Sequence, residues 1–379
     1  MYIHERDQWP NFRWNEAKIT KQLASLRLRQ GKLIGRMEAL GITLRSEAVL
    51  RTLTEDVLKT SEIEGEKLDP DQVRSSLACR LGIEIGALTP SDCDVEGVVE
   101  MMLDATQNYA KPLDAERLFG WHAALFPTGR SGMSKIVVGN WRDDSDGPMQ
   151  VVSGPIGRER VHFEAPKAKR LPAEMKAFIY WYNANTDLDA VLKAALAHLW
   201  FVTIHPFTDG NGRIARAIAD MSLARSEESA NRFYSMSAQI KNERNVYYDI
   251  LEHTQKGDLD ITDWLTWFLD CLDHAFVGAE TILASVLRRA NFWKKHAQTN
   301  LNDRQRLMLN KLLNGFEGKL TSSKWAKITK SSQPTAGRDI EQLIALDILR
   351  KDEAGGRSTS YSLVVWRKEH LGTVARHSG

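Results

Sequence analysis

A stretch near the middle of the chain holds most of the side chains that could do chemistry. It reads His205-Pro206-Phe207-Thr208-Asp209-Gly210-Asn211-Gly212-Arg213-Ile214-Ala215-Arg216. His205 is the one side chain among them that exchanges a proton near neutral pH, so it is the candidate general base. Asp209 offers carboxylate oxygens, which suit a Mg2+ ion that also binds phosphates. The stretch therefore combines a base with a metal ligand.

Apolar residues at helical spacing before and after this stretch predict two helices joined by a tight turn. Pro206 ends the first helix, because proline removes a hydrogen-bond donor and restricts the residue before it. Apolar spacing resumes at Ile214, so the Gly-Asn-Gly turn opens the second helix. Free N–H groups at such a turn form an anion site, most often for phosphate. Arg213 and Arg216, three residues apart, add two positive charges to its first turn.

Each of these features alone also fits a purely structural role. A histidine before a proline is usually a helix-end residue, and a Gly-Asn-Gly turn is usually only a turn. A plain helix–turn–helix, however, needs neither two arginines nor an acid beside the glycines. The combination therefore favours a catalytic site.

The stretch resembles the complete signature of the Fic family, HPFx(D/E)GNGRxxR. Most members of this family are helical enzymes that transfer AMP from ATP to a hydroxyl side chain of a protein. The resemblance implies that His205 is the general base, that Phe207 anchors the loop and that Asp209 binds Mg2+. It implies an ATP site that includes Gly210, Asn211, Gly212, Arg213, Ile214, Ala215 and Arg216, with Asn211 and the glycine amides on the inner phosphates and the arginines on the outer ones.

A second stretch, from Thr60 to Glu66, ends a predicted helix that begins near residue 44 or 46. Gly65 is typical of a helix C-cap, so Glu64 lies near the negative pole of that helix, an unfavourable place unless a cation faces it. From composition alone, a solvated acidic helix end is the simpler interpretation. Thr60, Glu64 and Gly65 nevertheless resemble the (S/T)xxxE(G/N) inhibitory motif of Fic proteins, whose glutamate pairs with the last signature arginine. By this resemblance Glu64 pairs with Arg216, whereas Glu62 and Glu66 are expected to matter little.

Two further regions complete the predicted catalytic domain. Short extended runs broken by glycine and proline predict a β-hairpin over residues 148–163. By resemblance this hairpin is the flap that aligns a target hydroxyl, with Val151, Val152 and Ser153 in it; an exposed hairpin can bind a peptide by strand addition. Tyr248 and Gln255, on a helix predicted over 245–255, line an adenine pocket by their position in the family. Aromatic residues at helical spacing, however, more often belong to the hydrophobic core. His122, on the apolar face of an earlier predicted helix, is expected to be a core histidine.

The last part of the chain changes character after a long helix predicted over 261–290. Three short helices are expected over 303–313, 322–328 and 333–346, followed by a two-stranded wing around residues 355–357. This order resembles a winged helix, a fold that reads DNA with its third helix. Many winged helices contact only proteins, so DNA and protein partners both remain open.

Composition limits the remaining possibilities. The 51 basic and 49 acidic residues balance, so no overall field points to nucleic acid or membrane. The three cysteines have no paired spacing, which disfavours a disulfide framework or a zinc site. The start of the chain lacks an apolar signal region and no apolar run is long enough to span a bilayer. We therefore expect a soluble, cytoplasmic protein without a membrane partner.

The sequence as a whole predicts a mainly α protein. Its expected parts are a helical cap with the inhibitory motif (1–85), a Fic core with one β-hairpin flap (86–295) and a winged-helix domain (300–379). The expected activity is AMP transfer from Mg-ATP to Ser, Thr or Tyr of a target protein or of the chain itself, with release of pyrophosphate. Two alternatives remain: removal of AMP from a modified protein, with Glu64 orienting water, and a DNA-binding regulator whose core senses nucleotide. The target and the oligomeric state, including a homodimer, stay open.

Overall fold

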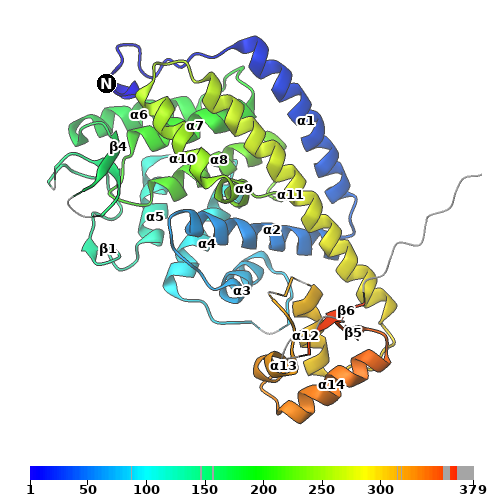
Figure 1. Ribbon diagram of the computed structural model, residues 1–379. Helices are drawn as coiled ribbons and strands as arrows, with labels where there is room; N and C mark the ends of the chain where they lie inside the picture. Colours follow the sequence, from blue (N-terminus) through cyan, green and yellow to red (C-terminus); the bar gives the residue numbers. More distant parts are fainter. Residues whose placement is uncertain are drawn as a thin grey trace, which may run out of the picture. The chain divides into compact units, whose positions relative to one another are not determined.

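The computed structural model describes residues 1–86, 88–145, 147–155, 158–313, 315–316, 318–352 and 359–364. It divides into two compact units, Met1–Leu283 and Ala284–Gly379. Figure 1 shows that helices dominate each unit, which confirms the mainly helical fold class. The division falls within the long helix α11, whereas the sequence pattern places the start of the last domain at residue 300.

The first unit contains most of the helices. In chain order they are η1 (Ile3–Glu5), α1 (Glu16–Glu38), α2 (Ile42–Ile63), α3 (Pro70–Leu81), α4 (Cys93–Gln107), α5 (Ala115–Leu125), η2 (Ala168–Arg170), α6 (Leu171–Asn183), α7 (Ala190–Ile204), α8 (Asn211–Glu227), α9 (Met236–Asn242), α10 (Arg244–Lys256) and most of α11 (Thr262–Lys295). Its strands are β1 (Arg130–Ser131), β2 (Ser134–Lys135), β3 (Gln150–Ser153) and β4 (Arg160–Glu164).

The centre of this unit is the pair α7 and α8. Helix α7 starts at Asp189, whose carboxylate accepts a hydrogen bond from the N–H of Val191 (2.8 Å). Its side chains are apolar on all sides and nearly all are buried, as expected of a helix surrounded by protein. Helix α8 packs along it and is buried from Asn211 to Ala224 apart from Gly212. The turn between these two helices is therefore fixed by the core on both sides.

Helix α2 is anchored on α8 by buried charges. Arg232, in the segment after α8, donates to Asp220 (3.0 Å) and to Glu227 (3.1 Å), and all three side chains are at most 3% exposed. Asp56 of α2 accepts hydrogen bonds from the Ser235 hydroxyl and from a backbone N–H in α9. Burial and the nearby Asp56 raise the pKa of Asp220 well above its usual value. The middle of α2 is thus tied to the helix that carries both signature arginines.

Helix α1 lies along α11, at the right of the first unit in Figure 1. Ion pairs join the two helices along their length, including Arg29 with Asp273 (2.6 Å) and Arg36 with Glu280 (2.9 Å). These side chains are largely exposed, so each pair contributes roughly 0–1 kcal/mol. Apolar residues such as Ile19, Leu26 and Leu33 are buried on the same helix and carry most of its packing.

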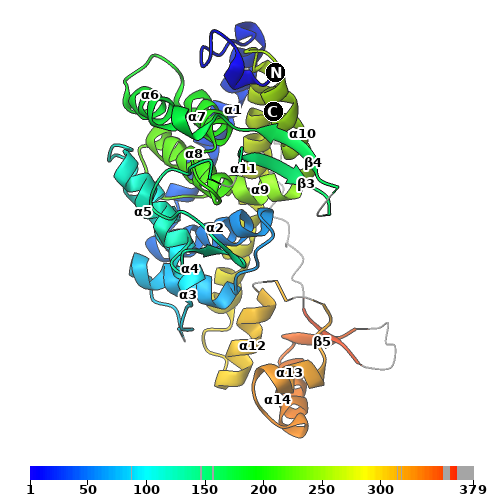
Figure 2. The same cartoon turned by 90° about the vertical axis from the view of Figure 1, so that its left-hand side faces the viewer.

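Two hairpins flank the turn between α7 and α8. Strands β3 and β4 pair antiparallel, Gln150 with Glu164 and Ser153 with Arg160, with an irregularity between Val151 and Val152. This hairpin lies where the sequence predicts a flap, although residues 156 and 157 at its tip are outside the described residues. Figure 2 shows both strands beside α10, where Glu252 binds Arg160 (2.9 Å) and His162 (2.5 Å) of β4. The smaller hairpin, β1 with β2, was not expected from the sequence.

The second unit has its own apolar core. It contains α12 (Asp303–Leu313), α13 (Ser322–Ile328), α14 (Gln333–Ala345), β5 (Leu349–Lys351) and β6 (Tyr361–Leu363). Trp325 and Ile340 are buried in this core, against which Phe292 and Trp293 from the end of α11 also pack. The three short helices and the strand pair follow the order expected of a winged helix, but the expected wing turn at 355–357 lies outside the described residues. A winged helix, and DNA as its partner, remain predictions.

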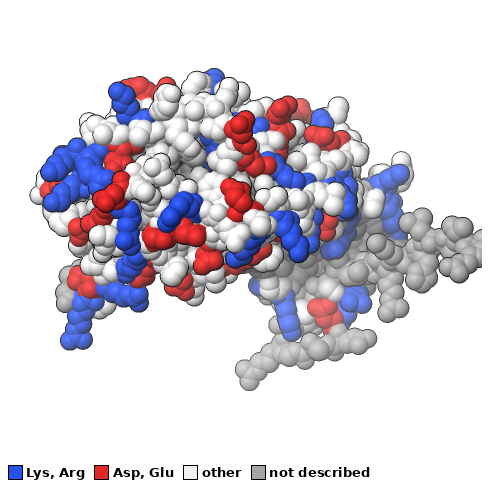
Figure 3. Space-filling model, turned by 90° about the horizontal axis from the view of Figure 1, so that it is seen from above, with Lys and Arg blue, Asp and Glu red and all other residues white. Residues whose placement is uncertain are grey.

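Charge is mixed over the surface. Figure 3 shows basic and acidic side chains interspersed over the face that it displays, in line with the balanced composition. In the part of the chain that the structure describes, no helix is both long and apolar enough to span a membrane.

Candidate functional site

His205 ends α7 in a left-handed backbone conformation (φ 52°, ψ 58°). A non-glycine residue in this region is strained, and such residues cluster at functional sites. Its Nδ1 lies 3.1 Å from the carbonyl oxygen of Val202. A carbonyl only accepts, so Nδ1 carries the proton and Nε2 keeps a free lone pair. Burial lowers the pKa of His205 to about 4, although the Val202 hydrogen bond opposes the change. The ring is therefore neutral at pH 7 and able to accept a proton.

Arg142 holds the backbone at His205 and at the next residue, Pro206, a role that the sequence pattern did not reveal. Its Nε donates to the carbonyl oxygen of His205 (2.8 Å), and its backbone N–H donates to that of Pro206 (2.9 Å). A third contact runs from Nη2 to the carbonyl of Pro166 (2.5 Å). The side chain is only 2% exposed. Arg142 thus connects the strained end of α7 to the base of the β3–β4 hairpin.

Phe207 fixes the loop in the core, as the Fic resemblance implies. It is fully buried, and the ring of His122 stacks on it with a centroid distance of 4.2 Å and an interplanar angle of 7°. His122 accepts a hydrogen bond from the N–H of Gly139 (3.2 Å) through Nδ1, and burial lowers its pKa to about 4. His122 is therefore a neutral core histidine, as expected from the sequence.

Asn211 closes the loop with its side chain. Its amide Oδ1 accepts from the N–H of Phe207 (3.0 Å), and its Nδ2 donates to the Phe207 carbonyl (2.8 Å). Both polar ends of this buried side chain are occupied. Asn211 therefore fixes the loop, and its backbone N–H and the second N–H of Nδ2 are the donors that could bind a phosphate.

Asp209 lies at the mouth of the glycine turn with its carboxylate oriented by two donors. Oδ1 accepts from the N–H of Gly210 (2.6 Å) and Oδ2 accepts from the Ser131 hydroxyl in β1. Within the described ranges, no group of three His, Cys, Asp or Glu side chains could hold a metal ion. A Mg2+ ion here would consequently need oxygens of a bound phosphate and of water besides Asp209, which is how this ion usually binds in phosphate sites. The residues present fit such an ion.

The first turn of α8 forms the candidate anion site. Gly210 is its N-cap with φ 78°, and the N–H groups that follow have no acceptor within the helix. Arg213 and Arg216 rise from this turn with side chains only 3% and 1% exposed. Nη1 of Arg216 is buried without a hydrogen-bond partner. Such an orphaned donor beside a helix N-terminus marks a place where a phosphate oxygen would be stabilised.

Ile214 and Ala215 belong to the same signature, but their side chains point into the core rather than towards the anion site. Both are fully buried apolar residues of the α7–α8 core. Their side chains therefore pack the helix, and only their backbone can take part in binding phosphate.

Glu64 occupies the anion site from the end of α2. Its Oε1 accepts from Nη2 of Arg216 (2.7 Å), while Thr60 accepts from Arg216 through Oγ1 (2.8 Å) and through its carbonyl (2.9 Å). A Cβ at Gly212 would collide with Oε1 of Glu64, so the carboxylate lies directly against the glycine turn. Burial alone would lower the pKa of Arg216, but Glu64 and two tyrosines raise it. The cation expected to face Glu64 is thus Arg216.

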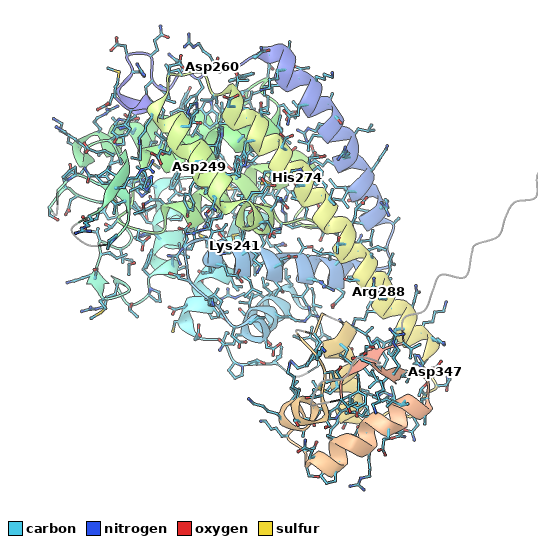
Figure 4. All side chains as sticks on the ribbon, viewed as in Figure 1. Lys241, Asp249, Asp260, His274, Arg288 and Asp347 are labelled. Atoms are coloured by element: carbon cyan, nitrogen blue, oxygen red, sulfur yellow. The ribbon has the colours of Figure 1, made fainter. Side chains whose placement is uncertain are left out.

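Two more cations hold the C-terminal end of α2. Lys241 donates to the carbonyl of Glu62 (2.7 Å) and Arg244 to that of Ile63 (2.9 Å). Cations stabilise the negative end of a helix, where carbonyls lack helical partners. Figure 4 labels Lys241 on α9, at the side of the site where α2 ends. Gly65 follows with φ 90°, a left-handed conformation that suits glycine and reverses the chain.

A cavity of about 600 Å³ joins these groups. Its wall contains all three flap residues that the sequence predicts, Val151, Val152 and Ser153, together with His205, Asp209, the glycine turn and Glu64. Its far side is α10, with Tyr248, Asp249 and Gln255; Figure 4 labels Asp249. Gln255 is also bonded through Nε2 to the Thr203 hydroxyl (3.2 Å). The base, the anion site and the predicted adenine residues therefore share one cavity of a size typical of small-molecule sites.

Comparison with known proteins identifies two domains of the chain. Residues 112–223 match the model of the Fic/DOC family, and residues 2–83 match a domain of unknown function, DUF4172. This chain carries a Fic/DOC domain. The prediction made from the signature is confirmed, and all residues from His205 to Arg216 lie inside the Fic/DOC match.

Curated relatives share this domain at modest identity. The chain is 28% identical over 205 residues to protein adenylyltransferase fic-1 of Caenorhabditis elegans, covering 54% of this chain and 37% of that protein. It is 35% identical over 101 residues to protein adenylyltransferase Fic of Drosophila virilis, covering 26% and 19%. The match thus spans well under half the length of these relatives.

A solved structure shares the fold of much of this chain. A Fic domain containing signaling protein from Bacteroides thetaiotaomicron aligns over 68% of this chain and 96% of its own, with a TM-score of 0.51 and 22% identity. This likeness supports the fold alone.

Proposed function

We propose that the chain transfers AMP from ATP to a hydroxyl side chain of a protein. The observation that carries the proposal is the neutral His205 with its free Nε2, in one cavity with the glycine turn that begins α8, the helix that carries Arg213 and Arg216. Nε2 takes the proton of the target hydroxyl as its oxygen attacks the α-phosphorus. The bond from that phosphorus to the oxygen bridging to the β-phosphate then breaks, and pyrophosphate leaves. The names of the curated relatives support the same reaction.

The other groups of the cavity have roles that follow from their positions. The N–H groups of the α8 turn and Arg213 and Arg216 bind phosphate oxygens and stabilise the charge that moves onto pyrophosphate. Asp209 would hold Mg2+, which neutralises phosphate charge when bound. Strand β3 has a free edge among the described residues, so an extended peptide can add to it beside His205. Tyr248 and Gln255 would bind the adenine.

We further propose that Glu64 inhibits this reaction within the chain. Its carboxylate lies against Gly212 of the glycine turn and binds Arg216, the place and the cation that a terminal phosphate would use. ATP must therefore displace Glu64 or bind in another pose. Removal of AMP from a modified protein is the second candidate, because Glu64 shares the cavity with His205 and could orient a water molecule there.

Labelled ATP tests the proposed reaction. With Mg2+ present, ATP labelled at the α-phosphate should leave label on the protein or an added target, whereas ATP labelled at the γ-phosphate should leave none. A protein that takes label from the γ-phosphate would be a kinase and would contradict the proposal. If the chain incorporates no label from ATP but releases AMP from a target protein that already carries it, the second candidate would be favoured.

A further inference from the structure

A second acid of the same segment reaches the second signature arginine. Glu66 follows Glu64 by two residues, across the left-handed Gly65, and its backbone N–H donates to the carbonyl of Ser61 (3.1 Å). Its Oε2 accepts from Nη1 of Arg213 at 2.6 Å. The contact revises the expectation that Glu66 matters as little as Glu62, whose carboxylate binds only Lys59 on its own helix among the described residues.

Packing against neighbouring side chains holds the Arg213 guanidinium in place. Its guanidinium lies over the ring of Phe126, 5.1 Å from the centroid, and its side chain is 3% exposed. Its Nε is buried without a hydrogen-bond partner. In the part of the chain that the structure describes, Glu66 is the acid that pairs with this arginine. Packing therefore sets the position of Arg213, and Glu66 binds its Nη1.

The Glu66 carboxylate is only half covered, and several acids lie near it. Its side chain is 47% exposed, unlike that of Arg213. Burial raises the pKa of Glu66 and outweighs Arg213, and Asp209, Asp94 and Glu64 raise it further. A phosphate with more charge and more acceptor oxygens would compete well for the same arginine.

We infer that Glu66 is a second inhibitory residue, which covers Arg213 as Glu64 covers Arg216. The inference rests on the proposed function, since it assigns both arginines to the outer phosphates of ATP. The two acids are two residues apart around Gly65 and the two arginines are three apart on one helical face, so one short segment blocks both. A ligand without outer phosphates, such as AMP, has no need to displace Glu66.

The test compares Glu66→Ala with Glu62→Ala in the full chain, using Mg-ATP and AMP as ligands in calorimetric titrations. Glu66→Ala should tighten ATP binding about two- to fivefold, the modest gain expected for a half-exposed pair. AMP binding should not change, and Glu62→Ala should alter neither ligand. The isosteric Glu66→Gln should give part of the gain, because it removes the charge and keeps the volume.

Different outcomes separate this inference from the proposed function. If Glu64→Gly binds and transfers AMP while Glu66→Ala matches Glu62→Ala, the role of Glu66 is overturned and the proposed function stands. Equal tightening of ATP and AMP would also overturn it, because the effect would then not involve the outer phosphates. If no variant, Glu64→Gly included, binds ATP, the proposed function fails and this inference fails with it.

Discussion

The two sides of the site are held in different ways. The catalytic loop, residues 205–216, is fixed by buried groups: Phe207 is fully buried, Asn211 closes the loop and Arg142 binds its backbone. The inhibitory segment, residues 60–66, is fixed at its end by charges that solvent reaches, with Glu64 30% and Glu66 47% exposed. Burial is costly to undo, whereas partly exposed ion pairs are weak and replaceable.

This difference suggests how inhibition can be relieved without unfolding the site. The body of α2 is tied to α8 by the buried Asp56, Asp220 and Arg232 cluster, so the whole helix is not expected to leave. Only its last turn and the segment after Gly65 depend on replaceable contacts. The catalytic loop is therefore built in advance, and the inhibitory segment can move away from it.

The largest expected effect lies on the catalytic side. In a Glu64→Gly background, His205→Ala should slow AMP transfer by about 10²- to 10⁴-fold, the usual contribution of a general base. ATP affinity should change little, because other groups bind the phosphates. Initial rates and calorimetric titrations measure the two quantities. Normal transfer by the variant would show that His205 is not the base.

The buried anchor of α2 is tested by stability. Arg232→Ala leaves Asp220 and Glu227 buried without their cation and should lower the free energy of unfolding by about 3–5 kcal/mol. Arg29→Ala, which breaks an exposed pair with Asp273, should cost roughly 1 kcal/mol or less. Urea unfolding of both variants makes the comparison. Similar small losses would mean that the cluster does not anchor α2.

Buried histidines should make stability fall in mild acid. Burial lowers the pKa of His205 to about 4 and that of His198 to about 3, from 6.5. In this range the unfolded chain binds more protons than the folded chain does. The free energy of unfolding therefore decreases as pH falls from 6.5 towards 4. At pH 5 each histidine should cost on the order of 2 kcal/mol. Urea unfolding at pH 7 and 5 measures the loss, which should be smaller in His205→Gln; equal losses would contradict the cited shift.

A smaller effect is expected from the end of α2. Lys241→Ala removes the donor to the Glu62 carbonyl and should loosen the last turn, raising AMP transfer about two- to fivefold. Lys59→Ala is the matched control, since Lys59 pairs with Glu62 on the outside of the same helix. Rates of self-modification with Mg-ATP measure both variants. Equal rates for the two variants would show that Lys241 does not keep Glu64 in its inhibitory position.

Much of this arrangement could be predicted from the sequence, because the signature is contiguous. The helix–turn–helix around it and the β3–β4 hairpin follow from patterns within short stretches. The contact of Glu64 with Arg216 was implied only by the family resemblance, since the residues alone favoured a solvated helix end. Arg142, Ser131 and Lys241 could not be found this way, because their partners lie far away along the chain. Glu66 looked equivalent to Glu62 in sequence, and only the turn at Gly65 brings one of them to Arg213.

The most direct measurement is the intact mass of the protein after incubation with Mg-ATP, for wild type, Glu64→Gly, Glu64→Gly with Arg216→Ala, and Glu62→Gly. The charge-assisted contact of Glu64 with Arg216 contributes about 1.5–3 kcal/mol. Its loss should raise the rate of AMP addition about ten- to a hundredfold in Glu64→Gly, and Arg216→Ala should abolish the gain. Glu62→Gly weakens the last turn of α2 but keeps the Glu64 carboxylate, so it should raise the rate no more than about two- to fivefold. A Glu64→Gly protein that gains no more AMP than wild type, with His205 intact, would contradict inhibition by this segment.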